Sequence, residues 1–252
     1  MINYILADYK RVVSRIPRIV FLVIYQVIFA LYVMNKITKA AGTYTSVSLV
    51  EHSNSFFSFW FLCVVCLVDF IQSFSFDFRA KTIQVALGIG ISRLQVILAK
   101  LIQTTLVMLT DFVITMATFG ILALIAGTPL AGHQLGYIIA NGLGSILLST
   151  CSISLLLPLV FRTQNMVMAM VGYFIMAPGV ITGAVRYLVR MGPAFLARLQ
   201  LDRYCHDCCC KLIQTNAIQG TFQLWPVIGA IAWFAIGIYL TWILFRKMEL
   251  DF

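Results

Sequence analysis

Long apolar runs alternate with short polar and basic segments along almost the entire chain. A hydrocarbon core about 30 Å thick is crossed by roughly 20 helical residues, and lipid offers no partner to an exposed backbone. Six apolar runs approach this length and predict transmembrane helices at 19–34, 56–74, 101–125, 135–161, 166–185 and 225–245. The first run is the shortest, and we expect Arg18 and Asn35 to extend it by reaching the two membrane interfaces.

The composition supports the same fold class. Apolar residues make up 61% of the 252 positions and charged residues 11%, whereas soluble domains average roughly 45–50% and 25%. No polar stretch is long enough to form a separate hydrophobic core. The sequence therefore predicts an all-α polytopic membrane protein in which residues 1–252 form a single transmembrane domain.

The lysine and arginine residues predict the orientation of the chain, because cytoplasmic segments of membrane proteins are enriched in them. Six spans place both termini on one side, and with the termini inside, 11 of the 18 cations are cytoplasmic. These cations are Lys10, Arg11, Arg15, Arg18, Arg79, Lys81, Arg93, Lys100, Arg162, Arg246 and Lys247. The last outer loop is also basic, but short early loops usually dominate the orientation. We expect a multi-pass protein of the cell membrane with both termini in the cytoplasm.

The net charge of +9 raises the question of nucleic-acid binding. The cations are spread over the segments that flank the apolar runs, without a single basic patch interleaved with aromatic residues. Anionic lipid head groups explain this distribution better. We therefore expect membrane lipids, and no nucleic acid, among the partners.

Residues 1–17 have helical periodicity ahead of the first span. The apolar positions are Ile2, Ile5, Leu6, Tyr9, Val12, Val13 and Ile16. Asp8 and three basic residues are expected on the opposite side, which predicts an amphipathic helix at the membrane interface that ends at Pro17. A signal peptide is the alternative, but the basic leader is long and no A-x-A cleavage site follows it.

Residues 76–100, between the second and third spans, carry four cations and one anion within an otherwise apolar chain. Their pattern predicts a short amphipathic helix, a turn at Gly88 and Gly90, and a helix that continues into the third span. Ser92 and Gln95 have the spacing of a capping box, which starts that helix. Such a segment suits either a lipid surface or a protein partner, and charge alone does not distinguish the two.

Within this segment, widely spaced residues form a recognisable motif. They are Asp77, Thr82, Leu87, Gly90, Arg93 and Lys100. Together with the basic N-terminal helix, the six spans and the closing FRKMELDF, the motif resembles permease subunits of the second, ABC-2-like type of ATP-binding cassette (ABC) exporters. It is similar in particular to permeases for the export of antimicrobial peptides such as lantibiotics, or for immunity to them. The resemblance covers nearly the whole chain and implies a bacterial plasma membrane.

The resemblance assigns a role to residues 76–100. In this family the corresponding segment is a cytoplasmic coupling helix that binds a separate ATPase, so the expected partner is a cytoplasmic ATP-binding cassette ATPase dimer. The interface candidates are Asp77, Arg79, Lys81, Thr82, Ile83, Gln84, Leu87, Gly90 and Arg93. The family also implies a second permease subunit, identical or different.

The chain contains no G-x-x-x-x-G-K-[ST] phosphate loop, so ATP hydrolysis requires a partner. A membrane-embedded enzyme is disfavoured because H-E-x-x-H and G-x-S-x-G are also missing from the sequence. We expect a non-catalytic transport subunit with no cofactor or metal of its own, while ATP and magnesium bind to the partner ATPase. Its expected function is to couple ATP hydrolysis to the efflux of a peptide, drug or lipid-like substrate.

Two carboxylates, Asp69 and Asp111, lie inside predicted spans. Charged groups in a membrane are costly enough to be functional candidates, here for a substrate pathway or for carrying protons. They support an alternative function, that of an ion- or proton-coupled secondary transporter or channel. The competing interpretation is structural. It gives the acids hydrogen-bonding neighbours among Gln72, Gln103, Thr110 and Thr115.

Residues 186–224, between the last two predicted spans, are too long for a simple turn and too apolar for a solvated loop. The resemblance implies short re-entrant or interfacial helices here, and we interpret the segment as an outer gate. Its sequence CHDCCC makes Cys205, Cys208, Cys209 and Cys210 disulfide candidates if the segment faces an oxidising exterior. Buried free thiols and a metal site are the alternatives, although structural zinc sites usually combine two separated ligand pairs.

Overall fold

A computed structural model describes residues 2–39, 45–79, 82–88, 90–127, 130–191 and 201–247. Every regular element within these residues is helical, which confirms the predicted all-α class. In chain order the elements are α1 (Ile2–Val13), α2 (Ile16–Lys39), α3 (Ser46–Phe57), a π-helical turn η1 (Phe61–Val65), α4 (Cys66–Arg79), α5 (Thr82–Gly88), α6 (Arg93–Ile125), α7 (Gly132–Thr163), α8 (Met166–Met176), α9 (Val180–Met191), a 3-10 turn η2 (Leu201–Tyr204), α11 (His206–Gln219) and α12 (Leu224–Lys247).

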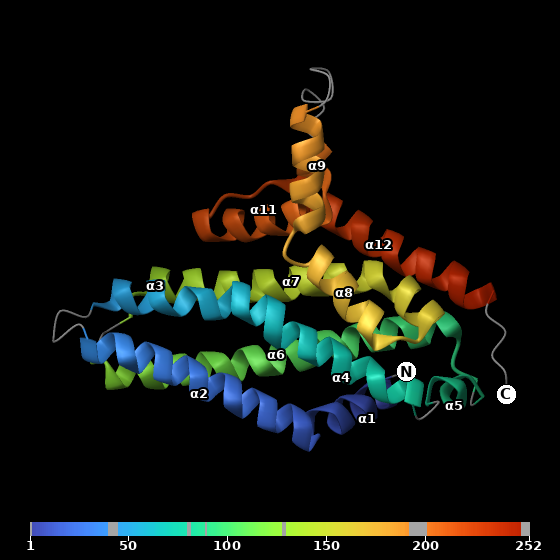
Figure 1. Ribbon diagram of the computed structural model, residues 1–252, viewed down its shortest axis with the longest axis horizontal. Coiled ribbons are helices and arrows are strands. Elements are labelled where there is room, and N and C mark those ends of the chain that lie inside the picture. The colour runs from blue at the N-terminus through green and yellow to red at the C-terminus, as the bar shows by residue number, and fades with distance from the viewer. Residues whose placement is uncertain are drawn as a thin grey trace.

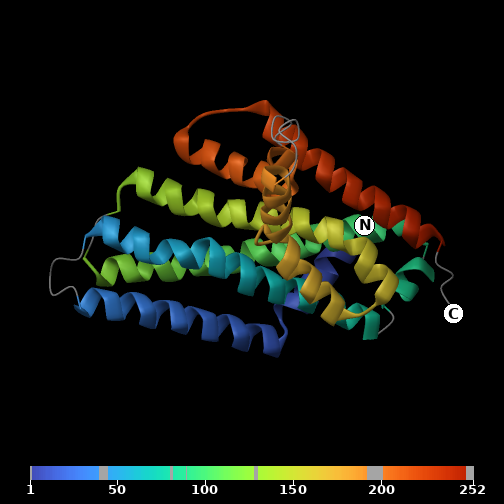
Figure 2. The same ribbon diagram turned by 45° about the horizontal axis from the view of Figure 1, so that its top comes forward.

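The long helices lie side by side as a bundle (Figure 1). Helices α2, α6 and α7 and the segment from α3 to α4 run along its length, whereas the short helix α5 lies at one end next to α4 and α6. We call this the α5 end, where α6 begins and α7 and α12 finish. At the opposite end α2 finishes and α3 begins. Helix α9 crosses the direction of the long helices, as Figures 1 and 2 both show.

Five helical segments are long and apolar enough to cross a membrane. They are Ile16–Lys39, Ser46–Ser75, Arg93–Ile125, Gly132–Thr163 and Leu224–Arg246. A sixth span results if α8 and α9 count as one, although these two helices meet at a bend of 49°. Apolar side chains such as Leu124 and Ile121 are largely exposed on the outside of the bundle, which suits contact with lipid. These are the long apolar helices of a multi-pass membrane protein.

The second span is longer than the sequence indicated. The predicted range 56–74 covers only the later part of a helical segment that starts at Ser46 and includes η1. Polar residues before position 56 join the helix because α7 supplies partners for them. Asn141 of α7, for example, donates from Nδ2 to Oδ1 of Asn54 at 2.7 Å. Hydrogen bonds between helices thus replace bonds to water along this stretch.

The N-terminal helix differs from the prediction in two respects. Pro17 does not end α1; it lies in the first turn of α2, where its missing backbone N–H costs no helical hydrogen bond. Asp8 does not face away from the apolar side; it is buried with Ile5 and Val12 where α1 packs against α6. The spacing of these three residues places them on one helical face.

An aromatic core fills the bundle between α2, α3 and α6. Phe57 makes edge-to-face contacts with Phe112 and Phe119, with ring centroids 6.1 and 5.7 Å apart. Phe29 of α2 extends the cluster through a further edge-to-face contact with Phe57. Helix α7 approaches the same cluster through Gly142, where a Cβ would overlap the Phe112 ring. Burial of these large rings fixes how the helices pack.

The contact between α7 and α12 yields a test of the packing. A Cβ added at Gly237 of α12 would lie 2.6 Å from the carbonyl oxygen of Ser154 in α7. We expect Gly237→Ala to destabilise the protein by about 1–3 kcal/mol, because a backbone atom cannot move aside as a side chain can. Thermal unfolding in detergent measures the effect. The control Gly120→Ala, at a position with no neighbour within 4 Å, should not lower the melting temperature; equal melting temperatures for the two variants would contradict the close contact.

Candidate functional site

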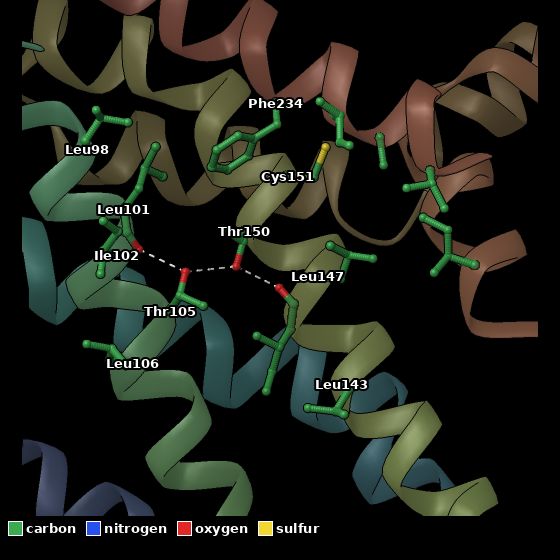
Figure 3. Close-up of a pocket in the computed structure, with 15 residues that line it drawn as sticks. Leu98, Leu101, Ile102, Thr105, Leu106, Leu143, Leu147, Thr150, Cys151 and Phe234 are labelled. Atoms are coloured by element: carbon green, nitrogen blue, oxygen red, sulfur yellow. Dashed lines mark hydrogen bonds between the residues drawn. The ribbon is translucent and has the colours of Figure 1, made fainter. Parts of the chain in front are cut away.

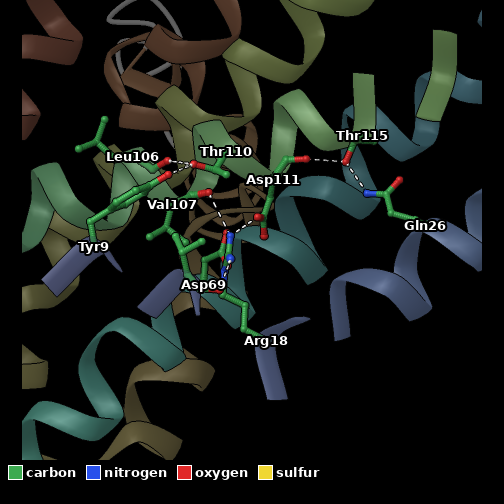
Figure 4. A network of polar contacts seen from close by, with 10 residues as sticks. Tyr9, Arg18, Gln26, Asp69, Leu106, Val107, Thr110, Asp111 and Thr115 are labelled. Atoms are coloured by element: carbon green, nitrogen blue, oxygen red, sulfur yellow. Dashed lines mark hydrogen bonds and ion pairs between the residues drawn. The ribbon is translucent and has the colours of Figure 1, made fainter. Parts of the chain in front are cut away.

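Three helices bring oppositely charged side chains together inside the bundle (Figure 4). Arg18 of α2 donates from Nε to Oδ1 of Asp69 on α4 at 3.2 Å, and from Nη2 to Oδ1 of Asp111 on α6. Its guanidinium also donates to the backbone carbonyls of Val13 and Val107. The three charged residues are almost fully buried, with exposed fractions of 1–2%. We call Arg18, Asp69 and Asp111 the buried triad.

The position of Arg18 corrects the expectation from sequence. Its side chain does not extend to a membrane interface but turns into the bundle. A guanidinium is expensive to remove from water unless an opposite charge compensates it. Asp69 and Asp111 supply that charge from two other helices. The triad therefore holds α2, α4 and α6 in a fixed relation.

Two polar neighbours that were expected to bond to the acids do not bond to their carboxylates, although Thr115 donates to the backbone carbonyl of Asp111 at 2.8 Å. Thr115 accepts a hydrogen bond from Nε2 of Gln26 at 2.8 Å. Thr110 is hydrogen-bonded to the hydroxyl of Tyr9 at 2.7 Å. The acids themselves bond to Arg18, which favours a structural role for them over an open substrate path.

A second buried ion pair lies closer to the α5 end. Lys100 of α6 is fully buried and pairs through Nζ with Oδ2 of Asp8 on α1, while Oδ1 of Asp8 pairs with Arg11. Lys100 was expected in the cytoplasmic segment, and its pairing with Asp8 was not predicted from the sequence. The signal was present in the spacing of Ile5, Asp8 and Val12, which turns the carboxylate toward the buried side of α1.

An apolar cavity of about 780 Å³ lies between α6, α7, α11 and α12 (Figure 3). Large apolar side chains line it, among them Ile102, Leu147 and Phe234. The hydroxyls of Thr105 and Thr150 point into this region but lie 3.3 Å from each other and bond to carbonyls of their own helices. A cavity of this size and character suits an apolar ligand group, such as an acyl chain or an apolar side chain.

The acids predicted for the substrate pathway, Asp69 and Asp111, lie outside the apolar cavity between α6, α7, α11 and α12. Neither Asp69 nor Asp111 is among the described residues that line the larger cavity. A smaller groove of about 580 Å³ between α2 and α6 reaches the buried triad through Arg18 and also contains Gln26 and Thr110. The structure thus brings the two predicted acids together at Arg18, away from the larger cavity.

The turn between α5 and α6 has the predicted form. Gly90 has a φ of +94°, which glycine adopts without strain. Ser92 and Gln95 form the capping box. The backbone N–H of Gln95 donates to Oγ of Ser92 at 3.3 Å, and the backbone N–H of Ser92 donates to Oε1 of Gln95 at 3.0 Å. Arg93 then donates from Nη1 to two backbone carbonyls in the last turn of α12, and its guanidinium lies 5.4 Å from the ring centre of Phe245. The start of α6 is thereby tied to the end of α12.

The side chains of α5 divide into a buried and an exposed face. Ile83 and Ala86 are buried and Leu87 is half-buried against the bundle, while Val85 is 59% exposed. Ile83 therefore packs within the chain, and Val85 is the exposed apolar residue among the described side chains of α5. The remaining interface candidates lie outside the described side chains: Asp77, Arg79, Lys81, Thr82 and Gln84.

The predicted outer segment contains η2 and α11, and α11 packs against α7 and α12; residues 192–200 lie outside the described residues. Asp207 in the first turn of α11 is buried, accepts a hydrogen bond from Thr182 of α9 and pairs with Lys211 at 3.5 Å. Gly179 has a φ of +84°, and a Cβ there would collide with the Asp207 carboxylate. The bend between α8 and α9 therefore depends on glycine and is held against α11.

His206 precedes Asp207 and is also buried. Its Nε2 lies 3.3 Å from Oγ of Ser152, and the ring also hydrogen bonds to the backbone carbonyl of Met176. Burial lowers the pKa of His206 below its ordinary value of 6.5, although the Asp207 carboxylate opposes this shift.

The four disulfide candidates are free thiols in the structure. Cys205 and Cys208 are half-buried, while Cys209 and Cys210 are buried. Burial raises the pKa of Cys209 to about 11, so its thiol is protonated at neutral pH. The thiol of Cys210 hydrogen bonds to that of Cys151 on α7, a contact that local sequence does not predict because the two residues are distant along the chain.

No protein-family model matches the chain, and no curated protein matches it in sequence.

Removing the cation of the buried triad should be costly. Arg18→Gln leaves two adjacent buried carboxyl groups without their cation, and loss of one partner from a buried ion pair typically costs about 3–5 kcal/mol. We expect a large drop in the melting temperature of the detergent-solubilised chain at neutral pH. Arg162→Gln is the control, because Arg162 is exposed at the end of α7. Equal stability of the two variants would show that the triad does not hold the bundle together.

The buried imidazole predicts a pH dependence. The pKa of His206 in the folded protein lies below 6.5, its ordinary value in an unfolded chain. Between these two pKa values the unfolded chain binds more protons than the folded protein, so acidification favours unfolding. This contribution to stability is fully present above pH 6.5 and is lost on acidification. Melting temperatures measured from neutral to mildly acidic pH should fall less steeply in His206→Gln than in the wild type. His133→Gln, which replaces an exposed histidine, should keep the wild-type profile.

Proposed function

We propose that this chain is the transmembrane permease subunit of an ATP-driven ABC exporter, with ATP hydrolysis carried out by a separate cytoplasmic ATPase dimer. The observation that supports this most directly is the attachment of α5 to the bundle. Its buried residues pack against neighbouring helices, a glycine turn and a capping box connect it to α6, and Arg93 joins α6 to α12. A short helix held in this way moves together with the ends of two long helices.

In this proposal, the ATPases displace α5 when they bind and hydrolyse ATP with magnesium. Because Ile83 and Ala86 are buried and Arg93 bonds to α12, the displacement alters how α6 and α12 pack against α7. The apolar cavity lies between these helices and α11, so its shape depends on that packing. ATP turnover would thereby act on a cavity suited to the apolar part of a peptide, drug or lipid-like substrate.

In this proposal the protein lies in a bacterial plasma membrane, the α5 end faces the cytoplasm, and both termini are cytoplasmic. This orientation is supported by the lysine and arginine distribution along the sequence. Membrane lipids contact the exposed apolar faces, and residues 186–224 serve as the outer gate. A second permease subunit, identical or different, completes the complex.

An ion- or proton-coupled secondary transporter or channel that uses Asp69 and Asp111 is the alternative function. Such carriers expose acids to a water-filled path, where the ion or substrate reaches them. Here both acids bond to Arg18, and the described lining of the larger cavity does not include them. The geometry therefore supports the exporter more strongly.

Purification tests the proposed partner. We expect the full chain, extracted in mild detergent from the cells that produce it, to retain an ATPase that mass spectrometry identifies by its phosphate-loop sequence. Val85→Glu should reduce the retained ATPase at least tenfold, because it places a charge on the exposed apolar position of α5. A chain that transports substrate without any ATPase would eliminate the exporter proposal.

Arg93→Ala separates binding from coupling. The described contacts of Arg93 run to α12, so this variant should still retain the ATPase but lose substrate-stimulated ATP hydrolysis in proteoliposomes. Arg162→Ala removes an exposed cation at the same end of the bundle and should keep both properties. Full stimulation in Arg93→Ala would contradict the role given to the connection between α6 and α12.

A further inference from the structure

The buried triad combines two acids with one base inside the helices that are apolar enough to cross a membrane (Figure 4). If both carboxylates were ionised, the triad would carry a net negative charge in a region where isolated charge is expensive. Other ionisable groups around Asp69 do not remove this excess. They are the thiols of Cys63 and Cys66 and the phenol of Tyr173. The cation Arg15 directs its described hydrogen bond to the backbone carbonyl of Gln72, and the charges that act on Asp69 are those of Arg18 and Asp111. Cysteine and tyrosine are themselves acids, so they add no positive charge.

The carboxyl oxygens of Asp69 and Asp111 differ in the number of hydrogen bonds that they accept. Oδ1 of Asp69 accepts from Nε of Arg18, and Oδ1 of Asp111 accepts from Nη2. Oδ2 of Asp69 is buried and has no hydrogen-bond partner among the described residues. The carboxyl groups of Asp69 and Asp111 lie within hydrogen-bonding reach of each other. An ionised Asp69 would therefore leave one oxygen unpaired next to another carboxylate.

We propose that the buried triad is a binding site for a single proton, carried by Asp69 and donated in a hydrogen bond to Asp111. The proton converts the surplus acceptor of Asp69 into a donor, so the contact between the two carboxyl groups becomes attractive. It also makes the triad electrically neutral: one guanidinium, one carboxylate and one carboxylic acid. Arg18 then compensates Asp111, and the hydrogen bond compensates Asp69. This inference concerns the membrane part of the chain alone and does not depend on an ATPase partner.

The site is distinguished from a purely structural ion cluster by its proton stoichiometry. A structural cluster of one cation and two anions would hold both carboxylates ionised at neutral pH. The proposed site holds one carboxylic acid at neutral pH, and that acid is lost when either aspartate becomes a neutral amide, because the remaining carboxylate is neutralised by Arg18. The structural cluster has no carboxylic acid and the proposed site has one, and vibrational spectroscopy detects this group directly.

Infrared spectroscopy of the full chain in lipid vesicles at neutral pH tests the proposal. We expect one carboxylic-acid C=O stretching band that shifts to lower frequency in D2O. The band should disappear in Asp69→Asn and in Asp111→Asn, and it should persist in Glu51→Gln, which alters an exposed carboxylate on α3. Absence of the band in the wild type, or its persistence in both asparagine variants, overturns the proposal.

Stability gives a second readout. The side-chain amide that Asp69→Asn introduces retains a donor toward Asp111, so this variant should unfold within a few degrees of the wild type, as judged against Glu51→Gln. The double variant Asp69→Asn with Asp111→Asn leaves Arg18 without a carboxylate and should unfold at a far lower temperature. Equal loss in the single and double variants contradicts the shared proton. The wild-type band decides the question by itself if a variant does not fold.

Discussion

The ion pairs between Arg18 and the two acids, Asp69 and Asp111, are the constraint on which the helix arrangement most depends. In a membrane, helices gain little from burying apolar surface against each other, because lipid is equally apolar. Unpaired charge, by contrast, is strongly penalised there. The triad joins helices from three separate parts of the chain, and the guanidinium of Arg18 is accommodated there only with a carboxylate beside it. It therefore specifies one packing of α2, α4 and α6 among many that hydrophobicity alone would allow.

Close contacts around α7 provide the second constraint. Gly144 lies against the side chain of Gln214 on α11, and Gly237 of α12 lies against the backbone of Ser154. Ser145 donates toward backbone carbonyls at the end of α3. Small residues let helices approach closely enough for such contacts to form. Helix α7 thus connects the first half of the bundle to α11 and α12, and the apolar cavity lies along that junction.

The basic segment between the second and third spans contributes part of its charge to contacts within the chain. Lys100 forms a buried ion pair with Asp8, and Arg93 donates hydrogen bonds to backbone carbonyls at the end of α12. Two of the four cations in residues 76–100 therefore have partners within the chain. The connection from α5 through Arg93, rather than the number of cations, is what supports a mechanical role for this end of the bundle.

The sequence by itself determined the features that depend on local chemistry: the all-α class, the approximate positions of the long apolar helices, and the turn at Gly90 with the capping box of Ser92 and Gln95. Each follows from neighbours within a few residues. Only the tertiary structure decided that Arg18 turns inward, that Asp8 is buried, and that the second span begins ten residues before its predicted start at position 56. The physical reason is that a charged or polar side chain on a helix takes the direction in which its partners lie, and these partners are far away along the chain.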